Sequence, residues 1–173
     1  MDFDVLSKMK PLMIILTLLV GVIPIFAGFS PQDIHEVRAY VYDYTQEEDN
    51  KALLKNGLLH KGIINKDGAR LNEQQVKRLI KAISTKQKEQ LGMLCYMPHH
   101  GFVFYNKQGN AIGHIELCFQ CGNVDSSPKK LAARPWNWSE IKKLLEEVKI
   151  PIVRKDDDYT KLYLAKQKKE NKT

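Results

Sequence analysis

The fold of this chain is decided by residues 95–122, which read CYMPHHGFVFYNKQGNAIGHIELCFQCG. Two apolar runs flank the polar stretch Asn106–Asn110, and on both sides the residues alternate in the way that paired β-strands require. The glycine in the middle of this stretch is typical of a hairpin loop. A hairpin with its tip at Gln108 and Gly109 places His99 opposite Cys118.

The same register collects the large apolar side chains of both strands on one face of the hairpin. Gly113 then lies opposite Phe104 and leaves room for its ring. Burial of such side chains contributes roughly 1.5–3 kcal/mol each, and a slip of one residue would turn all of them towards water. We therefore expect this face to fix the register. Its members are Phe102, Phe104, Ile115, Leu117 and Phe119.

Two segments outside the hairpin have the pattern of amphipathic helices. Residues 72–86 begin with Asn72, a favourable N-cap, and Gln75 follows at the position that completes a reciprocal cap. Residues 140–148 follow Ser139, which we expect to be the cap of the second helix. In both segments the apolar residues recur at the spacing of one helix face.

A further stretch, residues 37–44, alternates small aliphatic residues with tyrosines and predicts a strand. The chain lacks the regular strand–helix–strand order of a parallel sheet. We therefore predict an α+β fold: a small antiparallel sheet with two amphipathic helices packed on one face, after an N-terminal signal or anchor helix.

Residues 11–29 form an uncharged apolar run that follows Lys8 and Lys10. A basic start, an apolar centre and a small residue such as Ala27 at the exit are the layout of a secretory signal. The run is also just long enough to be retained as a membrane anchor. We predict export with cleavage, giving a periplasmic or extracellular domain. The alternative is a retained anchor with the domain facing outward and membrane association through residues 11–29.

The length of 173 residues fits one domain with tails. We divide the chain into residues 1–28 (signal peptide or membrane anchor), 30–152 (globular domain) and 153–173 (basic C-terminal tail). The net charge is +7, and residues 149–173 carry eight Lys or Arg and four Asp or Glu. The tail has neither clustered arginines nor interleaved aromatics, so it does not favour nucleic acid as a partner. The sequence leaves the partner undetermined.

All three cysteines of the chain lie in or next to the predicted hairpin. Cys95 precedes the first strand, and Cys118 and Cys121 form a Cys-x-x-Cys turn at the end of the second. His99 and His100 are the histidines nearest to these thiols. The face opposite the apolar set also carries Glu116 and His114, which we expect to support the cluster as a polar corner.

Three kinds of chemistry fit this cluster. Cys95, Cys118, Cys121 and either His99 or His100 form a ligand set that zinc favours, and this is the main hypothesis, with zinc as the cofactor. The first alternative is a non-enzymatic exported interaction domain with a structural Cys95–Cys121 disulfide, which persists outside the cytoplasm. The second is a thiol–disulfide redox protein that uses Cys118 and Cys121. The sequence does not decide whether the chain is an enzyme.

The pattern Cys-x-x-Pro-x-His-Gly followed by Cys-Phe-x-Cys resembles a group of small exported bacterial proteins with no assigned reaction. The likeness covers residues 95–123 and implies no activity. It implies that one set of residues belongs together, and it favours His100 over His99 as the functional histidine. The set is Cys95, Pro98, His100, Gly101, Cys118, Phe119 and Cys121.

Overall fold

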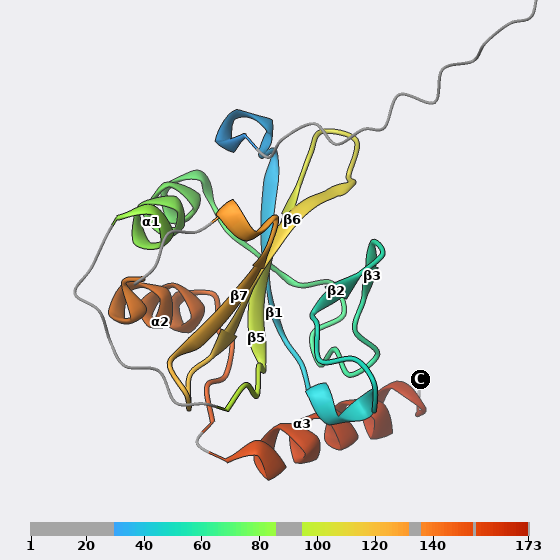
Figure 1. Cartoon of the computed structure of the whole chain (residues 1–173). Coiled ribbons are helices and arrows are strands. Elements are labelled where there is room, and N and C mark those ends of the chain that lie inside the picture. Colours follow the sequence, from blue (N-terminus) through green and yellow to red (C-terminus); the bar gives the residue numbers. More distant parts are fainter. Residues whose placement is uncertain (1–29, 86–94, 132–135, 154, 173) are drawn as a thin grey trace, which may run out of the picture.

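The computed structural model describes residues 30–85, 95–131, 136–153 and 155–172, and it is an α+β fold with a five-stranded antiparallel sheet (Figure 1). The described residues form seven strands: β1 (Glu36–Val41), β2 (Leu54–Lys55), β3 (Leu58–Leu59), β4 (Ala69–Arg70), β5 (His100–Tyr105), β6 (Ala111–Cys118) and β7 (Asn123–Ser127). Within the same parts of the chain there are three α-helices: α1 (Glu73–Ser84), α2 (Trp138–Glu147) and α3 (Asp156–Glu170). Short 3-10 turns occupy Pro31–Asp33, Tyr44–Gln46 and Lys129–Leu131.

The strands of the large sheet follow the order β4-β1-β5-β6-β7, and every pair is antiparallel. The predicted hairpin is β5–β6, and its register is confirmed by Phe104 facing Gly113 and His100 facing Leu117. A bulge between Phe104 and Tyr105 shifts the register only next to the loop. Burial of the apolar face therefore determines the strand register, because a slip of one residue would expose that face to water.

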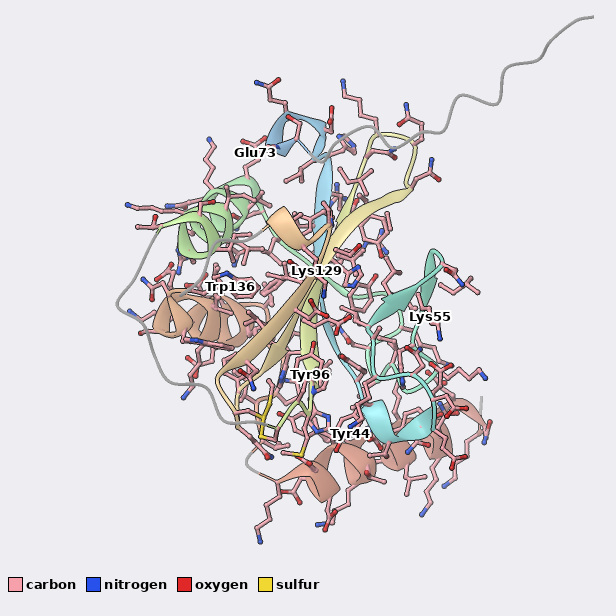
Figure 2. All side chains as sticks on the ribbon, in the orientation of Figure 1. Tyr44, Lys55, Glu73, Tyr96, Lys129 and Trp136 are labelled. Atoms are coloured by element: carbon pink, nitrogen blue, oxygen red, sulfur yellow. A yellow bond between two sulfur atoms is a disulfide. The ribbon has the colours of Figure 1, made fainter. Side chains whose placement is uncertain are left out.

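One face of the sheet forms the main core together with α1 and α2 (Figure 1). Trp136 lies beside α2 at the edge of this core (Figure 2) and is 3% exposed. The four hairpin residues Phe102, Phe104, Ile115 and Leu117 are fully buried in it, and Phe119 packs against it. From the helices, Leu79, Ala82 and Ile83 of α1 and Ile141, Leu144 and Leu145 of α2 join the same cluster.

The helix starts follow from local hydrogen bonding. Asn72 caps α1, and its side chain and that of Gln75 each accept a hydrogen bond from the other's backbone N–H, which confirms the predicted capping box. The cap of α2 is Asn137, whose side chain accepts from the N–H of Glu140 at 3.1 Å. The prediction that Ser139 caps this helix was wrong, because an Asn two residues earlier reaches the free N–H groups of the first turn.

The other face of the sheet is covered by a second, smaller cluster under the β2–β3 hairpin. Tyr40, Tyr42 and Val103 face this side, and Leu53 packs against them. The turn of β2–β3 is Asn56-Gly57, and both residues have positive φ, 53° and 79°, as a two-residue hairpin turn requires. This second layer changes the setting of the polar corner expected from the sequence, because it covers Glu116.

Helix α3 (Asp156–Glu170) lies across the end of the sheet (Figure 1). Its first turn holds Asp156, Asp157 and Asp158 and its last turn Lys168 and Lys169, so the charges complement the helix dipole. Tyr159 is 2% exposed and joins the main core. The segment predicted to be a basic tail thus contains a helix that is anchored by one aromatic ring.

The apolar run of residues 11–29, predicted as a signal or anchor, lies outside the described residues. Among the helices of residues 30–85, 95–131, 136–153 and 155–172, none is long and apolar enough to cross a membrane.

Candidate functional site

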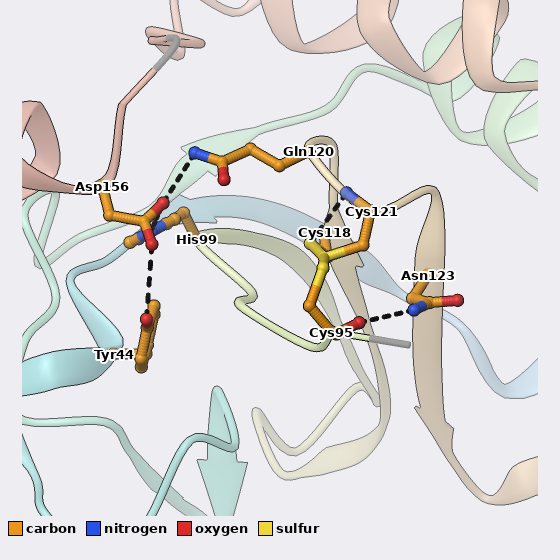
Figure 3. The surroundings of a disulfide bond; sticks show 8 residues. All are labelled: Tyr44, Cys95, His99, Cys118, Gln120, Cys121, Asn123 and Asp156. Carbon is orange, nitrogen blue, oxygen red and sulfur yellow. Dashed lines mark hydrogen bonds and ion pairs between the residues drawn. A yellow bond between two sulfur atoms is a disulfide. The ribbon is translucent and has the colours of Figure 1, made fainter. Parts of the chain in front are cut away.

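The three cysteines meet at the end of the sheet (Figure 3). Cys95 precedes β5, Cys118 ends β6, and Cys121 lies in the turn that leads into β7. The sulfur of Cys121 lies at disulfide distance from both other sulfurs, and its Cα is 6.0 Å from that of Cys95 and 5.6 Å from that of Cys118. Both separations fall within the range that a disulfide spans. The structure therefore gathers the three sulfurs around Cys121.

The local backbone explains why Cys121 occupies the centre. The chain reverses between β6 and β7 through Gly122, whose φ of +64° is a conformation that favours glycine. Within this turn the N–H of Cys121 donates to the sulfur of Cys118 at 3.3 Å. The side-chain amide of Asn123 donates to the carbonyl oxygen of Cys95 at 2.6 Å and so ties the segment that precedes β5 to the start of β7.

The exposure of the three sulfur-bearing residues differs. Cys118 is 0% exposed and Cys121 is 3% exposed, whereas Cys95 is only partly buried. Reagents and partners in solution therefore reach the cluster most directly from the side of Cys95.

The zinc hypothesis was wrong. In the described parts of the chain, no group of three or more His, Cys, Asp or Glu side chains is placed to hold a metal ion. Instead, each of the three cysteines has a sulfur neighbour at disulfide distance. A sulfur bonded to another sulfur has no thiolate to donate to a metal, so the geometry favours a disulfide.

His99, predicted as a ligand, packs in the interface between the sheet and α3. Its Nδ1 lies 2.9 Å from the carbonyl oxygen of Tyr42, which can only accept, so Nδ1 carries a proton. Its Nε2 lies 3.3 Å from a carboxylate oxygen of Asp156. The ring stacks on Tyr159 with 3.7 Å between centroids. Both ring nitrogens thus contact oxygen atoms, and burial lowers the pKa of His99.

His100, the second candidate ligand, points into the main core with Phe102 and Phe104, because the three alternate along β5. Its Nε2 donates to the carbonyl oxygen of Pro151 at 2.9 Å, and its ring meets those of Phe119 and Tyr159 edge-on. Burial lowers the pKa of His100 to about 4. The imidazole is therefore neutral at neutral pH and serves to fix the chain between α2 and α3.

Asp156 links the Cys-x-x-Cys turn to α3, a connection that the sequence analysis missed (Figure 3). Its carboxylate accepts from the Gln120 amide at 2.6 Å and from the Tyr44 hydroxyl at 3.4 Å, in addition to its contact with His99. Gln120 lies between Cys118 and Cys121. The first turn of α3 is therefore hydrogen-bonded to the turn that holds two of the three cysteines. An acidic run at a helix start is too common a pattern to predict such a contact.

Glu116 and His114, expected to support the cluster, form a separate buried network with Tyr96. The carboxylate of Glu116 accepts from the N–H of Leu53 at 2.9 Å and from the Tyr96 hydroxyl at 2.6 Å, and Nε2 of His114 lies 3.1 Å away. Glu116 is 2% exposed. A buried carboxylate with these partners holds the loop before β2 against the sheet.

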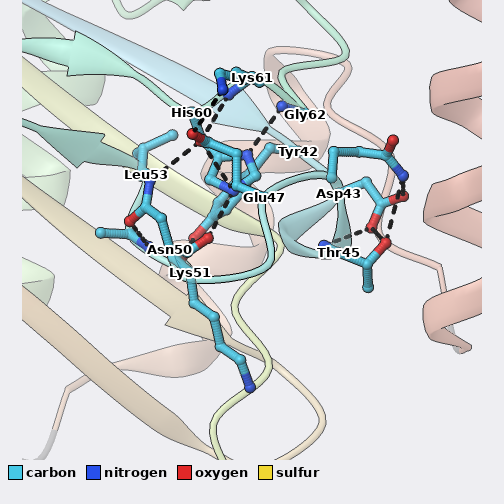
Figure 4. Close-up of polar contacts among 12 residues, drawn as sticks. Tyr42, Asp43, Thr45, Glu47, Asn50, Lys51, Leu53, His60, Lys61 and Gly62 are labelled. Atoms are coloured by element: carbon cyan, nitrogen blue, oxygen red, sulfur yellow. Dashed lines mark hydrogen bonds and ion pairs between the residues drawn. The ribbon is translucent and has the colours of Figure 1, made fainter.

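A second polar network orders residues 43–62 (Figure 4). Nδ1 of His60 accepts from the N–H of Gly62, so the proton lies on Nε2, which donates to the carbonyl oxygen of Asn50. Asp43 is buried; burial opposes its ionisation, but hydrogen bonds from Thr45 and other donors hold its pKa below the ordinary value. Both side chains thus make local hydrogen bonds that stabilise the turns in which they lie.

Two of the hollows on the described surface lie away from the cysteines. A cavity of about 280 Å³ lies between α1 and the start of α2, where Arg78 and Lys81 line it. An open hollow of about 430 Å³ lies near the end of α2, beside Lys149 and Pro151. No cysteine lines either of them, so neither supplies a binding pocket for chemistry at the sulfur cluster.

No family model, no curated protein and no solved structure shows a significant match to this chain. The function must therefore be argued from the cysteines themselves and from what surrounds them.

Proposed function

We propose that this chain is an exported, non-enzymatic interaction domain that is stabilised by a disulfide at Cys121. In this proposal the domain follows an N-terminal signal or anchor helix, with α1 and α2 as the cover of one sheet face. It works outside the cytoplasm, where a disulfide survives. In this proposal, the proteins that share the pattern of residues 95–123 also have a hairpin that is cross-linked by a disulfide.

The observation that carries the proposal is the sulfur contact between Cys95 and Cys121, which are 26 residues apart. The bond closes a loop that contains the whole β5–β6 hairpin. A cross-link of this length restricts the unfolded chain and stabilises the fold by roughly 3 kcal/mol. The apolar run at residues 11–29 supports export. An exported location would allow the disulfide to persist, and a disulfide is in turn typical of an exported domain.

A non-catalytic role is supported by the immediate surroundings of the sulfurs. The charged and imidazole groups near this end of the sheet are engaged in structural contacts: His99 with Tyr42 and Asp156, and His100 with Pro151. A group that acts as a general base must be able to reach a substrate proton. Neither histidine is arranged to do so.

The test is thiol counting on the full chain, purified in detergent without reductant and compared with a reduced sample. We expect one free thiol per chain before reduction and three after it, with no stoichiometric metal. Three free thiols in the unreduced protein together with one equivalent of zinc would overturn the proposal. Accumulation of the chain only in the cytoplasm of its host would overturn the exported location.

A further inference from the structure

One sulfur cannot form two disulfides at once, and yet the backbone places Cys121 within the Cα separation that a disulfide spans from each of the other two cysteines. The two pairs, Cys95–Cys121 and Cys118–Cys121, have Cα separations of 6.0 and 5.6 Å. A single backbone arrangement therefore accommodates either bond. In each case the third cysteine remains a thiol beside the bonded pair.

From this arrangement we infer that the disulfide moves between two positions, and that the movement uncovers a nucleophilic thiol at Cys95. This inference rests on the proposed disulfide at Cys121 and adds a chemical activity to it. The site would react with electrophiles of the class that thiolates attack, which includes the disulfides of other exported proteins.

The exchange needs no external oxidant or reductant. Cys118 gives up its thiol proton as its sulfur attacks the sulfur of Cys121. The Cys118–Cys121 bond forms as the Cys95–Cys121 bond breaks, and the bonding electron pair leaves on the sulfur of Cys95. That sulfur takes up the proton given up by Cys118, or it stays a thiolate and attacks an electrophile while the proton passes to solvent on the side of Cys95. One disulfide and one thiol are present before and after the step.

The turn between β6 and β7 is arranged for Cys118 to act as the attacking group. The N–H of Cys121 donates to the sulfur of Cys118 at 3.3 Å. A hydrogen bond to a sulfur favours its charged form, and the thiolate is the nucleophile in thiol–disulfide exchange. The same turn holds Cys121 next to it through Gly122, which adopts the positive φ that the chain reversal needs.

The two bonded forms differ in how accessible their free thiol is to solvent. When Cys95 is bonded to Cys121, the free thiol is Cys118, which is 0% exposed and closed to solvent. When Cys118 is bonded to Cys121, the free thiol is Cys95, which is partly exposed. Exchange therefore converts a protected thiol into an accessible one without unfolding the sheet.

The experiment is slow alkylation of the native full chain with iodoacetamide, followed by acid quenching, proteolysis without reductant and peptide mapping. We expect the wild-type protein to accumulate alkyl groups on Cys95 while the Cys118–Cys121 disulfide builds up to the same extent. The Cys118→Ser variant is the matched control, because it locks the Cys95–Cys121 bond. We expect at least a tenfold slower alkylation of Cys95 in this variant.

Two further variants keep the result interpretable. Cys95→Ser should form the Cys118–Cys121 disulfide completely, and Cys121→Ser should form no intramolecular disulfide and show two free thiols. Circular dichroism checks that each variant is folded. If the wild-type protein contains only the Cys95–Cys121 disulfide and is never alkylated at Cys95, the exchange is refuted while the structural disulfide stands. If no disulfide exists in any form, both proposals fail.

Discussion

At the scale of single residues, burial turns His100 into a structural group with a pH-dependent effect on stability. Its pKa is lowered from 6.5 to about 4 in the folded chain. Between these values the unfolded chain binds a proton that the folded chain does not. The free energy of unfolding therefore falls as the pH drops through this window, by about 1.4 kcal/mol per pH unit. Burial lowers the pKa of His99 as well, so its effect has the same sign.

We predict that His100→Gln removes part of this pH dependence, because a glutamine amide can still donate to the Pro151 carbonyl but does not titrate. The loss of unfolding free energy between pH 7 and pH 5 should be about 2 kcal/mol smaller than in the wild type. Urea unfolding at the two pH values measures it. His35→Gln, at an exposed histidine, is the control and should behave as the wild type. Equal losses in the wild type and His100→Gln would contradict the prediction.

The residue scale also shows what the sequence could reveal about the site. The alternation on the β5–β6 hairpin predicted its register, and with it the approach of Cys95, Cys118 and Cys121. It could not predict which groups the imidazoles of His99 and His100 contact. The partner of His100 is a backbone carbonyl at Pro151, and that of His99 is a carboxylate on α3. Neither partner is close in sequence, so both contacts depend on the complete fold.

At the scale of elements, the best predicted parts have a periodic apolar pattern. Such a pattern occurs in the helix at residues 73–84 and in the β5–β6 hairpin. β7 was missed because Asn123–Ser127 contains four polar residues and pairs with β6 only after the turn at Gly122. The strands of the β2–β3 hairpin are only two residues long and show no periodic pattern, although the Asn56-Gly57 turn between them is a strong local signal.

Helix α3 escaped prediction for a different reason: within it only Tyr159 is buried, so it has no continuous apolar stripe. Tyr159 stacks on His99, and its hydroxyl donates to the carbonyl oxygen and accepts from the N–H of Val153 at 3.3 and 3.2 Å. The sequence shows the acidic first turn and the basic last turn. These charges favour a helix but do not indicate where it packs.

We predict that Tyr159→Ala releases α3 and lowers the free energy of unfolding by about 3–5 kcal/mol, the range for removal of a large buried side chain. Tyr159→Phe keeps the ring stacked on His99 and should lose only about 1 kcal/mol. Leu164→Ala in the same helix is the control, since Leu164 is 51% exposed, and it should change stability by less than about 0.5 kcal/mol. Urea unfolding and amide hydrogen exchange of α3 measure these effects. Equal losses in Tyr159→Ala and Leu164→Ala would show that α3 is not anchored through Tyr159.

At the scale of the whole molecule, the two disulfide positions differ in how much of the chain they restrain. The Cys95–Cys121 bond joins residues 26 apart and encloses the β5–β6 hairpin, whereas the Cys118–Cys121 bond joins residues 3 apart within one turn. The entropy removed from the unfolded chain grows with the logarithm of the loop length. The two bonded forms of one fold should therefore differ in global stability.

We predict that oxidised Cys118→Ser, locked in the long loop, is more stable to urea than oxidised Cys95→Ser, locked in the short loop, by about 2 kcal/mol. Reduction with dithiothreitol should remove most of this difference, because both variants then have open chains and differ only in which thiol became a hydroxyl. Cys121→Ser, which can form neither bond, supplies the uncrosslinked reference and should match the reduced forms. If the two oxidised variants unfold at the same urea concentration, the long loop adds nothing to the stability of the sheet. The hairpin would then be held by its apolar face alone, which packs in one core with α1 and α2.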